Sequence, residues 1–112
     1  MAELDQTFTA LSDPTRRAVI ALLSEAPLRS SELASTLATS RPAMSRHLKV
    51  LREARIVVEE TRADDARTRV YRLRREAFSD LRSWLDEVEA FWGDQLAAFK
   101  AHAERKHRSG KR

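Results

Sequence analysis

The chain has 112 residues, of which 42% are hydrophobic, so it can form one folded domain with its own core. It contains no cysteine, which excludes disulfides, thiolate zinc sites and thiol redox chemistry. No apolar run approaches the ~18 residues that a membrane span requires, and no signal-peptide hydrophobic segment follows Met1. We therefore expect a cytoplasmic protein.

The formal net charge of +4 is distributed in blocks along the chain. Residues 1–40 carry a net charge of −2, residues 41–75 carry +6, residues 76–99 carry −5 and residues 100–112 carry +5. An evenly mixed solvated surface would not separate its charges in this way. Positive charge gathered in the centre and at the C-terminal end is typical of a nucleic-acid-binding protein.

Three short helices are predicted in the first 40 residues. Apolar residues at helical spacing indicate helices over residues 3–11, 14–25 and 31–38. Asp13 is a suitable N-cap for the second helix, and Ser30 is expected to cap the third.

Two arginines, Arg16 and Arg17, lie near the start of the second helix, where positive charge opposes the helix macrodipole. Either simple exposure or contact with phosphate would account for them.

The most strongly signalled helix follows Ser40, a favoured N-cap, and has Pro42 in its first turn. Its apolar residues Met44, Leu48 and Leu51 recur at helical spacing and mark a narrow buried face. The opposite face is rich in hydrogen-bond donors and carries Arg41, Ser45, Arg46, Lys49 and Arg52. Such a face suits the acceptor-lined major groove of DNA, and a solvated basic face is the alternative.

Two short helices joined by a tight turn, the second of them basic, form a helix-turn-helix pattern, although the usual turn glycine is absent.

Residues 56–62 and 69–74 are then rich in β-branched or aromatic residues and are predicted to be two strands. A strand pair directly after a recognition helix is a wing. Three arginines are expected to approach phosphate or a minor groove near its tip: Arg62, Arg67 and Arg69. Asp64 and Asp65 at the same tip oppose that contact.

From residue 76 to about residue 104 the helical period returns, with an apolar stripe on a helix that could exceed ~35 Å in length. One small domain cannot cover such a stripe, and the simplest partner is a second copy of the chain; a core helix within one chain is the alternative. Gly93 either bends this helix, admits another helix or is simply tolerated. The residues predicted at a dimer interface are Leu4, Phe8, Phe78, Leu81, Trp84, Leu85, Val88, Phe91, Trp92, Leu96 and Phe99.

The predicted fold class is mainly α with a small β-hairpin: a winged helix-turn-helix with a long C-terminal dimerisation helix. We expect residues 1–104 to form a single winged-helix DNA-binding and dimerisation domain. Residues 105–112 are expected to form a basic, disordered tail, which could add non-specific attraction to phosphate.

The order and spacing of these segments resemble the ArsR family of bacterial winged helix-turn-helix transcriptional repressors. The resemblance covers roughly residues 4–100, and its strongest matches are Leu-Ser-Asp-Pro-Thr-Arg-Arg at 11–17 and Ser-Arg-His-Leu-Lys-Val-Leu-Arg-Glu-Ala at 45–54. The family implies a homodimer that binds a pseudo-palindromic operator in double-stranded DNA, associates with the nucleoid and blocks transcription. Its base-reading positions fall on Arg41, Ser45 and Arg46, with Lys49 and the amide end at Ser40 on phosphate.

The chain departs from the family at two kinds of position. Arg55 lies between the recognition helix and the first strand, where the family usually has glycine. The family's metal ligands are also missing: Ala34 and Thr36 replace its Cys-x-Cys pair, and Asp86 and Asp94 lack the histidine that follows two residues later. We therefore expect no metal and no cofactor. A small-molecule effector and repression without a ligand both remain open.

No catalytic site is expected. Ser45 and His47 lie two residues apart on a helix and point to different sides, so they cannot form a nucleophile–base pair. His47 lies at the edge of the buried stripe, where it is expected to pack locally or touch phosphate. Two other functions fit the pattern: a winged-helix protein-interaction module that binds through the aromatic helix, and a non-specific nucleoid DNA binder.

Overall fold

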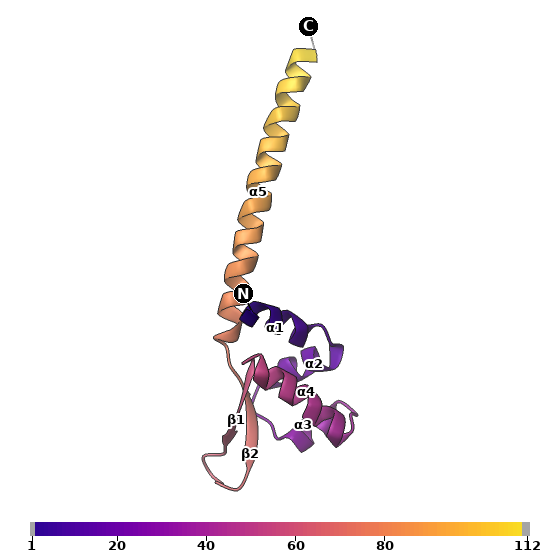
Figure 1. Cartoon of the computed structure of the whole chain (residues 1–112), viewed down its shortest axis with the longest axis vertical. Coiled ribbons are helices and arrows are strands. Elements are labelled where there is room, and N and C mark those ends of the chain that lie inside the picture. Colours follow the sequence, from indigo (N-terminus) through magenta and orange to yellow (C-terminus); the bar gives the residue numbers. More distant parts are fainter. Residues whose placement is uncertain (1, 111–112) are drawn as a thin grey trace. The chain divides into compact units, whose positions relative to one another are not determined.

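The structure is a computed structural model that describes residues 2–110, with side-chain environments for residues 3–107. Its elements in chain order are α1 (Ala2–Leu11), α2 (Pro14–Leu23), α3 (Ser30–Thr36), α4 (Arg41–Glu53), β1 (Val57–Thr61), β2 (Arg69–Leu73) and α5 (Ala77–Gly110) (Figure 1). Two compact units are present, one up to Asp80 and one from Leu81 onward. The architecture confirms the predicted fold class, a winged helix-turn-helix followed by a long helix.

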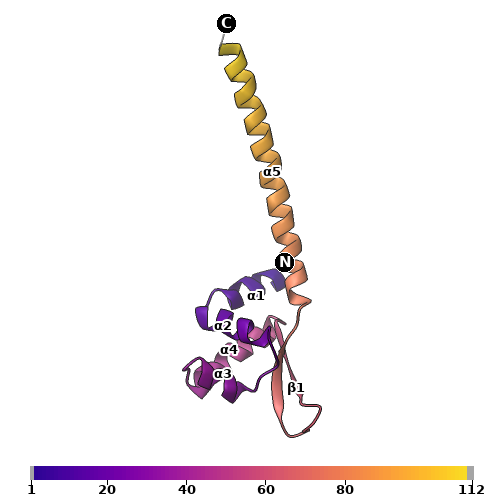
Figure 2. The same cartoon turned by 180° about the vertical axis from the view of Figure 1, so that it is seen from behind.

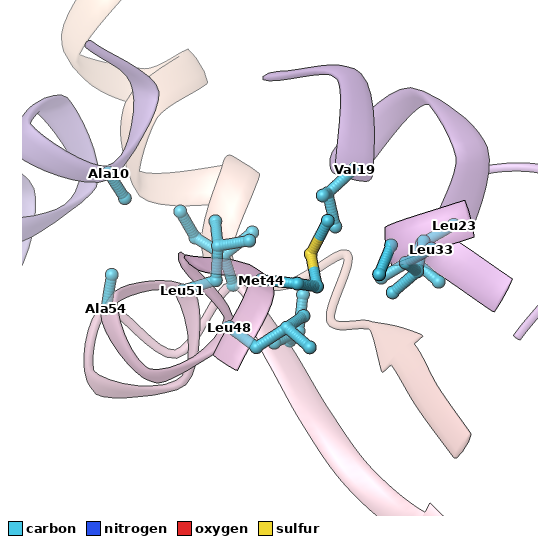
Figure 3. Packing of buried hydrophobic residues seen from close by; sticks show 11 residues of the cluster. Ala10, Val19, Leu23, Leu33, Met44, Leu48, Leu51 and Ala54 are labelled. Atoms are coloured by element: carbon cyan, nitrogen blue, oxygen red, sulfur yellow. The ribbon is translucent and has the colours of Figure 1, made fainter. Parts of the chain in front are cut away.

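The core of the first unit is built mainly from one face of each of α2, α3 and α4, with Ala10 of α1 and the start of β1 added to it (Figure 3). Met44, Leu48 and Leu51 of α4 are fully buried, as their helical spacing predicts, and they pack in one cluster with Val19 and Leu33. Burying three such side chains contributes roughly 1.5–3 kcal/mol each relative to exposure. This burial fixes the rotation of α4 about its axis and leaves its opposite face to solvent.

The predicted caps are present at two of the helices. The carboxylate of Asp13 accepts a hydrogen bond from the backbone N–H of Arg16 at 3.0 Å, and the hydroxyl of Ser40 accepts from the N–H of Ala43 at 3.2 Å. The prediction for α3 is wrong by one residue, because the N-cap is Arg29 and Ser30 is already helical. The physical reason is Glu32, whose carboxylate accepts from the backbone N–H of Arg29 at 3.0 Å.

Both helices of the helix-turn-helix end in a left-handed residue that is not glycine. Ala38 follows α3 with a φ of 51°, and Arg55 follows α4 with a φ of 59°. After α4, the N–H of Ile56 donates to the carbonyl of Leu51 at 2.9 Å, and the N–H of Arg55 donates to Arg52 at 2.9 Å. This is the Schellman pattern, so the chain keeps the turn that glycine favours without having glycine.

The wing is an antiparallel hairpin in which Glu59 lies opposite Tyr71. Both strands are one or two residues shorter than predicted. The connector before α3 joins them through an isolated bridge, because Leu28 and Tyr71 exchange backbone hydrogen bonds of 3.2 and 2.8 Å. In both views the hairpin extends from one side of the group formed by α1–α4 (Figures 1 and 2).

The long helix α5 continues to Gly110, so residues 105–110 are helical where we expected a disordered tail. The reason is local: the apolar stripe stops, but residues 101–106 are almost all strong helix formers. The last two positions of the expected tail, 111 and 112, lie outside the described residues. No helix in the described part of the chain is both long and apolar enough to cross a membrane.

Candidate nucleic-acid interface

The solvent-facing side of α4 carries cations that have no partner among the described side chains. Arg41, Arg46 and Lys49 are exposed, and their side chains make no ion pair or hydrogen bond with any residue whose side chain is described. Ser45 is exposed between them. Because the buried face of α4 fixes its rotation, these residues share the surface that a phosphate backbone or base edges could reach.

The three arginines predicted to bind DNA from the wing differ in their side-chain partners. The guanidinium of Arg62 is bound by the carboxylate of Asp64 in a fork, with N–O distances of 3.1 and 3.3 Å. Arg69 donates to Glu59 at 2.9 Å. Only Arg67 keeps a guanidinium without a hydrogen bond or ion pair among the described side chains. Of these three arginines, Arg67 is therefore ready for phosphate without breaking an existing contact.

Asp65 holds the wing loop through two hydrogen bonds. Its carboxylate accepts from the backbone N–H of Arg67 at 3.0 Å and from the hydroxyl of Thr68 at 2.8 Å. These two hydrogen bonds, the backbone one first, lower the pKa of Asp65. The loop that carries Arg67 is thus held by a charged acceptor.

Glu59 ties the recognition helix to the wing, a role that the sequence analysis did not identify. Its carboxylate accepts from Arg52 at 2.9 Å, from Arg69 at 2.9 Å and from the hydroxyl of Tyr71 at 3.3 Å. The hydrogen bond from Arg69 is the main cause that lowers the pKa of Glu59, while burial raises the pKa of Tyr71. An acidic residue inside an arginine-rich strand pair was the sequence signal available for it.

Arg16 and Arg17 donate hydrogen bonds to the C-terminal end of α1, a contact that neither sequence alternative included. Arg16 donates from Nε to the carbonyl of Ala10 at 2.8 Å and from Nη2 to Thr9 at 3.0 Å. Arg17 donates from Nη1 to the carbonyl of Leu11 at 2.7 Å. Positive charge is favourable at this end of a helix, so the apparent misfit at the start of α2 is a cap for α1.

His47 lies half-buried against α2. Its Nδ1 is 3.3 Å from Nη1 of Arg16 and 3.9 Å from Oδ2 of Asp13. The backbone N–H of Arg16 is the main cause that lowers the pKa of Asp13, with smaller contributions from the charges of His47 and Arg16. His47 therefore makes local contacts through Nδ1, and its contact with phosphate stays a prediction.

Five of the eleven apolar side chains expected at a dimer interface are exposed on α5. Phe91, Trp92, Leu96 and Phe99 are 58–71% exposed, and the rings of Phe91 and Trp92 meet edge to face with centroids 6.1 Å apart. Leu85 and Phe8 are 47% and 40% exposed. Leu4 is buried, and the remaining candidates, Phe78, Leu81, Trp84 and Val88, are partly buried.

No group of three or more His, Cys, Asp or Glu in the described part of the chain is arranged to hold a metal ion. The geometry instead defines a class of protein: a basic helix fixed over a helical core, followed by a charged two-stranded wing, is a winged helix-turn-helix DNA-binding domain.

Comparisons with known proteins agree with this class. Residues 11–60 match the helix-turn-helix domain family. The chain is 41% identical over 95 residues to the HTH-type transcriptional regulator Rv2034 of Mycobacterium tuberculosis, an alignment that spans 85% of this chain and 83% of that protein. It is also 33% identical over 54 residues to the transcriptional repressor SdpR of Bacillus subtilis, spanning 48% of this chain and 60% of SdpR.

Solved structures are similar over most of the chain. An ArsR-like transcriptional regulator from Rhodococcus sp. RHA1 has a TM-score of 0.77 at 33% identity and covers 88% of this chain and 91% of its own. Another ArsR family transcriptional regulator has a TM-score of 0.72 at 32% identity, with coverages of 81% and 97%. The chain belongs to the ArsR family of winged helix-turn-helix transcriptional regulators. It is a DNA-binding regulator and not an enzyme.

Proposed function

We propose that the protein is a homodimeric transcriptional repressor that binds a pseudo-palindromic operator through α4 and the wing. The observation that carries the proposal is the set of exposed cations on the outer face of α4 that have no ion-pair or hydrogen-bond partner among the described side chains. A cation already bound to a carboxylate would have to break that ion pair before it met phosphate. Arg41, Arg46 and Lys49 need no such exchange.

Within this surface, Arg41, Ser45 and Arg46 read base edges in the major groove. Arginine forms paired hydrogen bonds with guanine, and serine can donate or accept. Lys49 and the amide end of α4 at Ser40 bind backbone phosphate and set the register of the helix.

The wing adds a second contact, led by Arg67. Arg62 and Arg69 contribute only when phosphate competes with Asp64 and Glu59, which hold them in the free protein.

The exposed apolar stripe of α5 supports the homodimer. Four large side chains of this helix are more than half exposed, and contiguous exposed apolar surface of this kind marks an association site. A second copy offers the same stripe, and binding of a two-fold pair to two half-sites requires its recognition helices to lie about 34–36 Å apart, one turn of DNA. A repressor role is supported by the similarity to SdpR, which is named as a repressor.

Fluorescence anisotropy with duplexes selected from random DNA tests the proposal. We expect a preferred, pseudo-palindromic sequence that the protein binds at least ~10³-fold more tightly than unrelated DNA, with an affinity that falls steeply with salt. Affinity that depends on salt but not on sequence would instead identify a non-specific nucleoid binder. Sedimentation equilibrium distinguishes the proposed dimer from the remaining alternative, a protein-interaction module. A monomer at micromolar concentration contradicts the dimer and favours that alternative.

A further inference from the structure

We propose that Arg16 is a positioning residue for DNA binding, which holds His47 in one tautomer so that its Nε2–H donates to a backbone phosphate. The inference rests on the proposed function and adds a neutral contact to the charged contacts of α4. The guanidinium of Arg16 is itself occupied by its contacts with α1 and with His47.

The guanidinium of Arg16 is fixed at three points. Nε donates to the carbonyl of Ala10 at 2.8 Å, Nη2 donates to Thr9 at 3.0 Å, and Nη1 lies 3.3 Å from Nδ1 of His47. The backbone N–H of Arg16 is held in turn by Asp13. Because the two carbonyls fix the plane of the guanidinium, Nη1 keeps one direction, toward the imidazole.

This contact determines where the proton of His47 lies. A guanidinium is always protonated and can only donate, so Nδ1 of His47 must be the acceptor. A neutral imidazole that accepts at Nδ1 carries its proton on Nε2, which becomes a donor. The carboxylate of Asp13, at 3.9 Å from Nδ1, is too distant to replace Arg16 as a hydrogen-bond partner.

The Nε2 atom of His47 is not fully buried, and the side chain of His47 is 21% exposed. Nε2 has no hydrogen-bond partner among the described side chains, and within that part of the chain no buried side-chain nitrogen or oxygen lacks a partner. His47 also follows Arg46 directly and lies at the border between the buried stripe of α4 and its basic face. A donor at that border is placed for the phosphates that flank a groove, where neutral side chains commonly bind.

Nitrogen NMR of the free protein tests the tautomer without DNA. We expect His47 at pH 7.5 to show an unprotonated Nδ1 and a protonated Nε2, and Arg16→Met to convert it to a mixture of tautomers. His102 and His107, both exposed on α5, serve as internal controls that Arg16→Met leaves unchanged. A protonated Nδ1 in the wild-type protein would overturn the proposal.

Binding measurements test the phosphate contact with two matched variants. Asparagine at position 47 places its polar group near Nδ1, whereas glutamine places an N–H near Nε2. We expect His47→Asn and Arg16→Met each to weaken DNA binding about fivefold, the loss of one neutral hydrogen bond, and His47→Gln to recover most of that loss. The salt slope stays constant in all three variants, because a neutral donor releases no counterion.

Two results would contradict the contact: His47→Asn binding as tightly as the wild type, or His47→Gln losing as much as His47→Asn. The same series is run on the selected operator and on an unrelated duplex at low salt, because phosphate contacts do not depend on sequence. If no preferred operator is found, the proposed function is contradicted, but the phosphate contact of His47 can still be tested on the unrelated duplex. Circular dichroism of each variant shows whether the α1 cap made by Arg16 is also needed for folding.

Discussion

Arg52 donates from Nη1 to Oε2 of Glu59 at 2.9 Å, and this ion pair joins the last turn of α4 to the first strand of the wing. The other oxygen of Glu59 accepts from Arg69 at 2.9 Å. One carboxylate thus holds the recognition helix and both strands of the hairpin in a fixed relation. A protein that reads one groove with a helix and an adjacent backbone with a wing needs that relation to be constant.

Replacing Glu59 with glutamine is expected to destabilise the protein by about 1 kcal/mol at pH 7, since partial exposure screens the charged contacts. The folded-state pKa of Glu59 lies below its ordinary value of 4.5, so its contribution is present above that value and is lost as pH falls through the folded pKa. Urea titrations should therefore show the difference between wild type and Glu59→Gln closing on acidification below about pH 4.5. Glu60→Gln, which breaks the exposed pair with Arg72, is the matched control and should change little.

Replacing Arg55 with glycine is expected to stabilise the fold by about 0.5–1 kcal/mol, because the left-handed backbone after α4 strains any residue with a side chain. The hydrogen bond from Arg74 to the carbonyl of Arg55, at 2.6 Å, uses only the backbone of residue 55 and is kept. Thermal unfolding measures the change. Glu53→Gly, two residues earlier and still within α4, should lower the free energy of unfolding by about as much as Arg55→Gly raises it.

Arg46→Ala and Lys49→Ala should affect DNA binding in different ways. Loss of a base-reading arginine should cost about 1–3 kcal/mol on the preferred operator and relax the sequence preference at one position. Loss of a phosphate-binding lysine should weaken all sequences alike and reduce the salt slope by about 1. Anisotropy titrations over a series of salt concentrations separate the two. If the sequence preference survives Arg46→Ala, another residue of α4 reads that base.

Leu96→Asp should convert the proposed dimer to a monomer, because it introduces a charge into the most apolar part of the α5 stripe, where Leu96 is 63% exposed in the single chain. Sedimentation velocity measures the outcome. Asp94→Asn, on the same helix but outside the stripe, is the control that should leave association unchanged. A wild type and a Leu96→Asp variant with equal sedimentation coefficients would contradict the α5 interface.

Gly93→Ala is expected to stabilise α5 by about 0.8 kcal/mol, because alanine is the better helix former and, apart from the adjoining helix backbone and chain neighbours, no described atom lies within 4 Å of the added Cβ. Helical ellipticity and thermal midpoint should both rise, and Ala97→Gly should lower them by a similar amount. A loss of association in Gly93→Ala would show instead that another helix approaches the glycine in the dimer.

Features of the fold that depend on residues close in the chain could be predicted from the sequence, whereas contacts between distant residues could not. The order of the elements, the caps at Asp13 and Ser40 and the buried face of α4 follow from residues three or four apart, so they could be predicted from the chain alone. Two predictions were wrong because two local signals compete. Ser30 was predicted to be the N-cap of α3, but Glu32 accepts from the backbone N–H of Arg29, which is the N-cap. The end of the apolar stripe was taken as the end of the helix, but α5 continues beyond it.

The tertiary structure determines which of the cations form ion pairs with carboxylates. By composition, Arg46, Arg62 and Arg69 are equivalent members of one basic block. In the fold, Glu59 binds Arg69 of the neighbouring strand and Asp64 binds Arg62, while Arg46 has no such partner among the described side chains. Arg16 and His47, 31 residues apart, likewise meet only because core packing places α2 beside α4. Hydrogen bonds and ion pairs depend on tenths of an ångström between elements, and that placement is set by the packing of the buried side chains, which local periodicity does not encode.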